Sequence, residues 1–197
     1  PKPTIAHESA GLGGVTASQV AAMLLLGRVW GFVKYHHPAV AGGVHSALDP
    51  APPKAPSFGP NQLSFERMGL DWDAEFARML PIIATAPDRA AVQRALDTWL
   101  HDLGDPAACK PCASLPTELW LRPDLAWLSD TTLLGRALSE RLTRLYNNRW
   151  NGDRQRYVER SAVGGLTFIE SSDSLSMLPS RTGRILGLMR FFAVLEY

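Results

Sequence analysis

The sequence has little net charge, and its apolar stretches are short. The 197 residues carry a net charge of +1 with 20% charged residues, so no broad basic field is present. Binding to nucleic acid or to an anionic membrane surface therefore has no support in the composition. The longest nearly apolar stretch, residues 21–33, has 13 residues and contains Arg28, whereas a bilayer span needs about 20. No membrane span is expected, and the 46% hydrophobic content is typical of a chain with a packed core.

The sequence also lacks the local motifs of common catalytic and cofactor sites. It contains no G-x-S-x-G or S-x-x-K pattern for a serine nucleophile, and no Walker or G-x-G-x-x-G loop for a nucleotide. Its five histidines do not form an H-E-x-x-H motif, and there is no second C-x-x-C. We therefore predict no catalytic residue, no metal site and no cofactor in this chain.

The sequence contains two similar apolar stretches that both predict a helix. Residues 21–38, AAMLLLGRVWGFVKYHHP, predict a helix that is apolar nearly all round and buried on most sides. Gly27 and Gly31 share one face of it and allow another backbone to approach closely. The stretch 184–197, RILGLMRFFAVLEY, aligns with the first when Tyr197 is placed on Tyr35, which also places Arg190 on Arg28. This similarity makes an internal duplication the interpretation to test.

The hydrophobic pattern predicts a mainly α fold, a bundle of about five helices with long loops and at most a small β-hairpin. Thr16 or Ser18 would cap the first helix, Asp71 or Asp73 would start the second, and Asp88 would cap the third. We divide the chain into a flexible lead-in (1–15), a helical bundle (16–104) with a proline-rich loop insert (39–70), a loop-rich arm (105–183) with a helix (130–147) and a hairpin (154–170), and the truncated start of a second repeat unit (184–197).

Cys109 and Cys112 form the sharpest local pattern, Cys-Lys-Pro-Cys. A redox C-x-x-C follows a strand and opens a helix, but here the flanks are interrupted by prolines. A structural short-range disulfide is therefore favoured over half of a metal site, free thiols or redox catalysis. Such a small loop contributes about 2 kcal/mol at most, and a disulfide implies an oxidising compartment.

Arg28 is the only charged residue between Ala21 and Val33, and Arg190 is the only one between Ile185 and Leu195. A buried guanidinium needs a carboxylate or several carbonyls. Buried ion pairs are the favoured interpretation, with an anion site as the alternative. The chain begins at Pro1, and PKPTIAHESAGLGG lacks the apolar core of a signal peptide. We expect that the chain was processed or cut out of a larger protein.

Several segments together resemble a known family. They are GRVWGFVKYHHPAV, DWDAEFARMLP, WLHDLGD, CKPC with DLAWL, YNNRWNGDRQRYV, GLTFIE and RILGLMRFFAVLEY. In kind and order they are similar to the N-terminal, non-catalytic region of bacterial C-terminal-processing (tail-specific) serine peptidases, which have a crotonase-like catalytic core. The resemblance covers nearly the whole chain from about residue 23 onward.

The resemblance implies a serine endopeptidase as the full-length parent, with its serine and lysine in a downstream domain. None of those motif positions exists in this sequence, so this chain alone is expected to be inactive. The implied partners are the downstream peptidase domain of the same polypeptide and a polypeptide substrate. The implied location is the periplasm or the cell exterior, with a signal peptide already removed.

Two other classes of function stay open from the residues. One is a stand-alone helical module that binds a protein or peptide, and the weaker one is a thiol oxidoreductase built on Cys109 and Cys112. A homodimer through the C-terminal helix is a further partner interpretation. We predict that Leu188, Phe192 and Leu195 pack on the first unit or on a second molecule, because so apolar a helix cannot stay exposed. Exposure of all three side chains would contradict this prediction.

Overall fold

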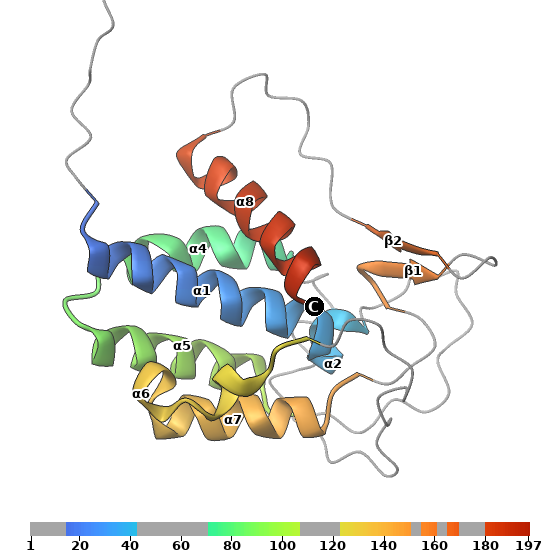
Figure 1. Cartoon of the computed structure of the whole chain (residues 1–197), viewed down its shortest axis with the longest axis horizontal. Helices are drawn as coiled ribbons and strands as arrows, with labels where there is room; N and C mark the ends of the chain where they lie inside the picture. The colour runs from blue at the N-terminus through green and yellow to red at the C-terminus, as the bar shows by residue number, and fades with distance from the viewer. Residues whose placement is uncertain (1–14, 43–70, 107–122, 151–154, 161–164, 170–179) are drawn as a thin grey trace, which may run out of the picture.

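The described residues of this computed structural model form a mainly helical fold with one small sheet (Figure 1). They are residues 15–42, 71–106, 123–150, 155–160, 165–169 and 180–197. The predicted class, a mainly α bundle with at most a small β-hairpin, is confirmed. Most of the predicted insert at 39–70 lies outside the described residues, but its first residues, 39–41, are helical and not loop.

Helix α1 (Ala17–His36) is the element that the others cover. Thr16 caps it: the Thr16 hydroxyl accepts the Gln19 N–H at 3.2 Å, and the Gln19 side chain accepts the Thr16 N–H at 2.9 Å. From Leu25 to Tyr35 every residue except Arg28 is buried. Pro38 then begins the short helix α2 (Pro38–Ala41), where its missing N–H costs nothing.

Helices α4 (Trp72–Ala84) and α5 (Arg89–Leu103) pack against α1. Of the two predicted starts of α4, Asp71 is the cap, because its carboxylate accepts the Asp73 and Ala74 N–H groups. The Asp88 carboxylate accepts the Ala91 N–H and caps α5, as predicted. Pro81 lies within α4. The buried faces are the predicted ones: Trp72, Phe76, Met79, Leu80 and Ile83 on α4, and Val92, Leu96, Trp99, Leu100 and Leu103 on α5.

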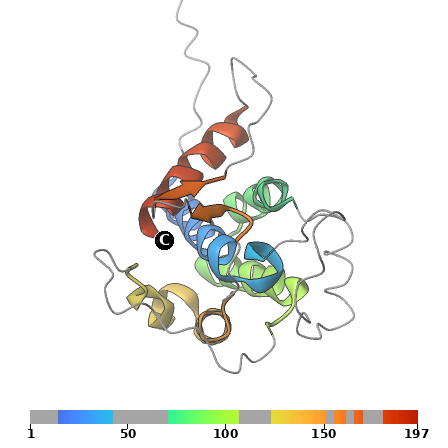
Figure 2. The same ribbon diagram turned by 90° about the vertical axis from the view of Figure 1, so that its right-hand side faces the viewer.

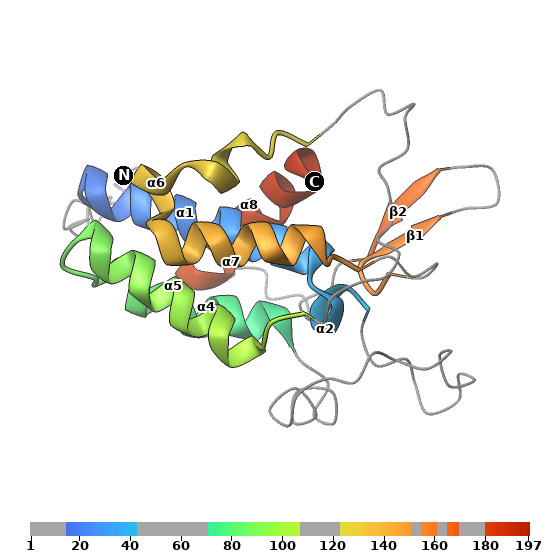
Figure 3. The same ribbon diagram turned by 90° about the horizontal axis from the view of Figure 1, so that it is seen from below.

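The predicted helix at 130–147 is two helices and not one. A 3-10 turn, η1 (Ala126–Ser129), leads into α6 (Thr131–Leu134), and α7 (Arg136–Asn147) follows. The break lies at Gly135, whose φ of 71° belongs to the left-handed region and interrupts the helix. Figure 3 shows α7 lying alongside α5, which it contacts directly.

Strands β1 (Val158–Arg160) and β2 (Leu166–Phe168) form the small antiparallel hairpin predicted for residues 154–170. Phe168 meets the ring of Tyr35 edge to face, with the ring centroids 6.1 Å apart. The Arg156 N–H donates to the Ala41 carbonyl at 2.7 Å. The hairpin is therefore attached to the C-terminal end of α1 and to α2.

The last helix, α8 (Arg181–Glu196), crosses α1 and α4 at the edge of the bundle (Figure 1). It packs through Leu186, Met189 and Ala193. The prediction that Leu188, Phe192 and Leu195 pack on the first unit is wrong, because they are 59%, 38% and 70% exposed. The small residues of α1 accept the Met189 and Ala193 side of the helix, which turns the bulkier stripe outward.

Candidate functional site

The pairing of α1 with α8 brings the two similar helices together through their small residues. A Cβ added to Gly27 would lie 2.0 Å from the Met189 sulfur, and one added to Gly31 would lie 2.7 Å from the Ala193 Cβ. The close approach that the glycine spacing predicted is therefore present, and its partner is the C-terminal helix. Side chains at either position would force the two helices apart.

Arg28 and Arg190 each form an ion pair at this junction. Arg28 contacts Glu196 of α8 at 2.6 Å, and its guanidinium lies over the Trp127 ring, 5.0 Å from the ring centroid. Arg190 contacts Asp73 of α4 at 2.5 Å. The Arg28 side chain is 29% exposed and that of Arg190 is 13% exposed. The two guanidiniums thus join α8 to α1 and to α4 through carboxylates, which is the arrangement expected for structural ion pairs.

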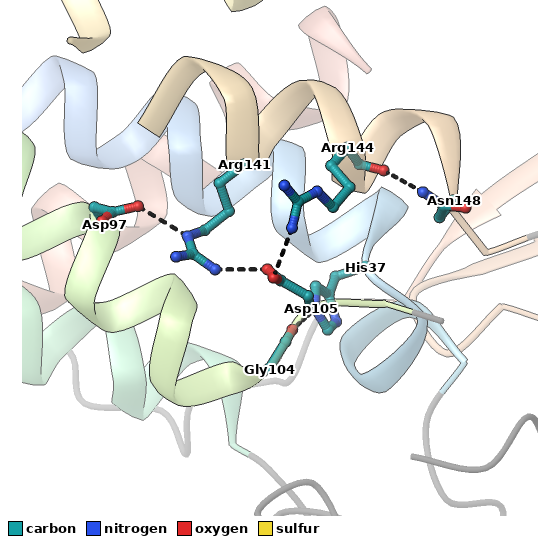
Figure 4. A network of polar contacts seen from close by, with 7 residues as sticks. All are labelled: His37, Asp97, Gly104, Asp105, Arg141, Arg144 and Asn148. Carbon is teal, nitrogen blue, oxygen red and sulfur yellow. Dashed lines mark hydrogen bonds and ion pairs between the residues drawn. The ribbon is translucent and has the colours of Figure 1, made fainter. Parts of the chain in front are cut away.

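A second polar cluster lies where α5, α7 and the end of α1 meet (Figure 4). The Arg141 guanidinium donates to Asp97 at 2.8 Å and to Asp105 at 2.5 Å. Arg144 donates to the other Asp105 oxygen at 3.1 Å. Burial opposes the charged form of Arg141, but the two carboxylates outweigh it and raise the pKa of its guanidinium. This cluster fixes α7 to α5 and to the residues that follow α5.

Helix α1 ends at the partly buried His36, and the buried His37 follows it. His37 caps α2 by accepting the Ala39 N–H at Nδ1, so its Nε2–H donates to the Gly104 carbonyl at 2.9 Å (Figure 4). His36 Nδ1 lies 2.8 Å from the Phe32 carbonyl. Burial lowers the pKa of both imidazoles from 6.5 to about 4, against the smaller opposing effect of their hydrogen bonds to backbone carbonyls. Both side chains are therefore neutral at neutral pH and act in packing and capping.

The described residues do not assemble a serine nucleophile with a base. The buried Ser139 hydroxyl donates a hydrogen bond to the Leu128 carbonyl at 2.5 Å, so its proton is directed at a backbone carbonyl and not at a general base. Lys34 is fully buried, with its ammonium 4.9 Å from the Trp30 ring centroid and 4.6 Å from that of Tyr157. Lys34 therefore contributes a cation–π contact between α1 and the hairpin.

Other kinds of site have little support in the described part of the chain. Within those residues no group of three or more histidine, cysteine, aspartate or glutamate side chains is placed to hold a metal ion. None of the described helices is both long and apolar enough to cross a bilayer. Cys109 and Cys112, the predicted disulfide pair, lie outside the described residues.

A cavity of about 120 Å³ lies between the start of α1 and the start of α5. Its lining is mostly apolar and includes Asp88, whose carboxylate already caps α5. The other polar lining residues also have hydrogen bonds: Ser18 and Gln19 with Thr16, and Arg89 with the Thr132 carbonyl. Comparison with family descriptions, curated proteins and solved structures finds no match to this chain.

Sequence reasoning did not identify the Asp97–Arg141–Asp105 cluster. Its members lie on separate elements, and only Arg141 stands out in the sequence, as a charge within an otherwise apolar helix face. The capping role of His37 could have been inferred from its place directly before Pro38, since Pro is favoured at the first position of a helix. The contacts of Arg28 and Arg190 needed the fold, because their carboxylates are far away in sequence.

Proposed function

We propose that this chain is the N-terminal, non-catalytic helical module of a serine peptidase of the C-terminal-processing family. The observation that carries the proposal is the α1–α8 pair. Two helices of one sequence type pack through equivalent positions, and α8 leaves an apolar face uncovered. That arrangement fits a module that continues into further structure, and the quoted sequence segments fit the family's N-terminal region.

The described residues support a role outside the chemistry itself. The Ser139 hydroxyl donates a hydrogen bond to a backbone carbonyl, and the ammonium of Lys34 lies over the rings of Trp30 and Tyr157. In the proposed parent the serine and its base lie downstream, and this module packs on the catalytic part, shapes substrate access or mediates assembly. The proposed location is the periplasm or the cell exterior.

The test compares this chain with the polypeptide encoded by its complete natural gene. The complete polypeptide is expected to cleave unstructured peptides and to lose that activity with a serine-directed inhibitor, whereas the 197-residue chain is expected to be inactive. Inhibitor-sensitive cleavage by the 197-residue chain would contradict the proposal. So would a complete polypeptide without inhibitor-sensitive cleavage.

The uncovered face of α8 also favours a second candidate, a stand-alone helical module that binds a protein or peptide. Its four large apolar side chains are at least 38% exposed, and such patches mark interaction sites. The natural reading frame separates the two candidates. A peptidase needs several hundred further residues after Tyr197, whereas a stand-alone module needs a stop codon there.

A further inference from the structure

The uncovered side chains of α8 have counterparts on α1 that are completely buried. With Tyr197 placed on Tyr35, the counterparts of Leu188, Phe191, Phe192 and Leu195 are Leu26, Val29, Trp30 and Val33. The four residues on α1 are 0% exposed, while those on α8 are 59%, 63%, 38% and 70% exposed. Equivalent positions of the repeated helix are therefore covered in one copy and open in the other.

On α1 this face is covered by the helices that follow it in the chain. The Trp30 ring meets Phe76 of α4 edge to face, with the centroids 5.4 Å apart. The Trp30 Nε1–H donates to the Trp72 carbonyl at 2.9 Å, and the Trp72 Nε1–H donates to the Trp30 carbonyl at 3.1 Å. α5 also contacts α1. The covering element is thus an amphipathic helical hairpin, α4–α5.

The two repeated helices face each other through equivalent positions. Gly27 lies against Met189, and Gly31 lies against Ala193, and each of these pairs is also a pair in the alignment. Two parallel helices that contact through equivalent residues are related by a local twofold axis along the pair. In Figure 2, α4 lies on one side of the α1–α8 pair. The local twofold predicts a second helix of this kind on the opposite side, beside α8.

The charges at the junction follow the same symmetry. Arg190 of α8 reaches Asp73 on the α4 that covers α1. The equivalent Arg28 would reach the equivalent aspartate of a second hairpin. In the structure, Arg28 instead contacts Glu196 and lies over the Trp127 ring, and its side chain is 29% exposed. Within the described residues the buried Glu196 Oε2 has no hydrogen-bond partner. The exposed part of the Arg28 side chain, beside Trp127, is therefore open to a further polar partner.

Leu24 gives an independent check of the symmetry. It lies one turn before Arg28 on the same face of α1, and its counterpart Leu186 lies one turn before Arg190 on α8. Leu186 is 6% exposed and Leu24 is 51% exposed. The side of the pair next to α4 is closed at Leu186, and the equivalent side is open at Leu24. One turn further along α1, the Trp127 ring lies against Arg28 on that side.

We infer that the surface formed by Leu24 and Arg28 of α1 with Leu188, Phe191, Phe192 and Leu195 of α8 docks a second helical hairpin of the α4–α5 type. This hairpin is an amphipathic pair whose first helix carries a carboxylate at the position of Asp73, and it belongs to the polypeptide that follows Tyr197. The inference rests on the proposed function only in requiring a longer parent chain. It does not depend on catalysis.

A second copy of the chain is the competing occupant. An isologous α8–α8 contact would cover the exposed apolar residues of α8, but it would leave Leu24 and Arg28 of α1 uncovered. A hairpin that lies beside both helices covers the residues of α1 and those of α8 together. Protection of Leu24 as well as Leu195 therefore distinguishes a hairpin from a second copy.

The experiment measures maleimide labelling, resolved by peptide mass spectrometry, of single variants Leu24→Cys, Leu195→Cys and, as the control on α4, Ile82→Cys, which is 46% exposed. Each is made in the 197-residue chain and in the same chain extended by its next roughly 70 natural residues, the length that separates Tyr35 from the end of α5. Labelling at Leu24→Cys and Leu195→Cys is expected to slow about tenfold or more in the extended chain. Labelling at Ile82→Cys is expected to stay the same.

Equal labelling in both chains would overturn the inference, and so would a natural gene that stops after Tyr197. Slow, concentration-dependent labelling of Leu195→Cys in the 197-residue chain would assign the surface to a second copy. Protection that appears only with the complete polypeptide would assign it to the catalytic domain. Because peptidase activity is measured separately, an active parent with an unprotected surface would refute this inference and leave the proposed function standing.

Discussion

Replacing Gly31 by alanine is expected to weaken the α1–α8 contact, although alanine is the better helix former. A Cβ at this position would lie 2.7 Å from the Ala193 Cβ and 3.5 Å from the Ala193 Cα. Neither atom belongs to a flexible side chain that could move aside. The backbones of the two helices must separate to admit one methyl group.

The magnitude follows from two opposing effects. Alanine in place of glycine in a helix interior contributes about 0.5–1 kcal/mol of stability. Overpacking a close contact costs about 1–3 kcal/mol. The free energy of unfolding is therefore expected to fall by about 1 kcal/mol in Gly31→Ala, since the packing cost is the larger effect.

Gly187 in α8 supplies the matched control, because a Cβ added there meets nothing within 4 Å. Gly187→Ala is expected to raise the free energy of unfolding by about 0.5–1 kcal/mol. Both variants are measured by urea titration followed by circular dichroism. The double variant Gly31→Ala/Ala193→Gly exchanges the two side chains across the contact, so it should lie within about 0.5 kcal/mol of the unchanged protein.

The close-packing argument is refuted if Gly31→Ala stabilises the protein as much as Gly187→Ala does. It is also refuted if the double variant shows no coupling between the two sites. In either case α8 does not pack on Gly31 in solution, and the local symmetry of the pair loses its basis.

Three further predictions test the rest of the core. Because the buried His37 has a pKa of about 4 against 6.5 for a free imidazole, the native state binds fewer protons than the unfolded state between these values. The stability that neutral His37 contributes is therefore present above pH 6.5 and lost as the pH falls toward 4. The variant His37→Asn keeps a capping oxygen, and in urea titrations it should remove about 2 kcal/mol of the stability change between pH 7 and pH 5. An unchanged pH profile would contradict this prediction. Arg141→Gln should lower the unfolding free energy by about 1 kcal/mol at low ionic strength and by less at high ionic strength, and an effect independent of salt would argue against the ion pairs with Asp105. Trp72→Phe, which removes the N–H bond to Trp30, should cost about 2 kcal/mol in the same assay, and a neutral effect would refute the reciprocal indole contacts.

The sequence was sufficient to predict the elements whose signals are local. Asp71 and Asp88 cap their helices because a carboxylate before an amphipathic run satisfies the first N–H groups wherever the helix packs. The apolar faces of α4 and α5 follow from helical periodicity, since each helix has a single buried side. These predictions needed no knowledge of the partner helix.

Other features depended on tertiary context. Gly135 divides the predicted helix at 130–147 because its backbone adopts φ of 71°, and a glycine within an apolar pattern does not show that by itself. The rotation of α8 about its axis was also not predictable from periodicity. The helix is apolar on two sides, and only the position of Met189 and Ala193 against α1 decides which side is buried.

This ambiguity is informative about the molecule. A helix that is apolar nearly all round requires burial on most sides. α1 meets that requirement with α4 and α5 on one face and α8 on another. α8 has the same kind of sequence, but its described contacts bury only the Leu186, Met189 and Ala193 side. One face of α8 therefore stays exposed in these contacts. On α1 the equivalent face packs against α4 and α5, and that is the kind of element we propose for the exposed face of α8.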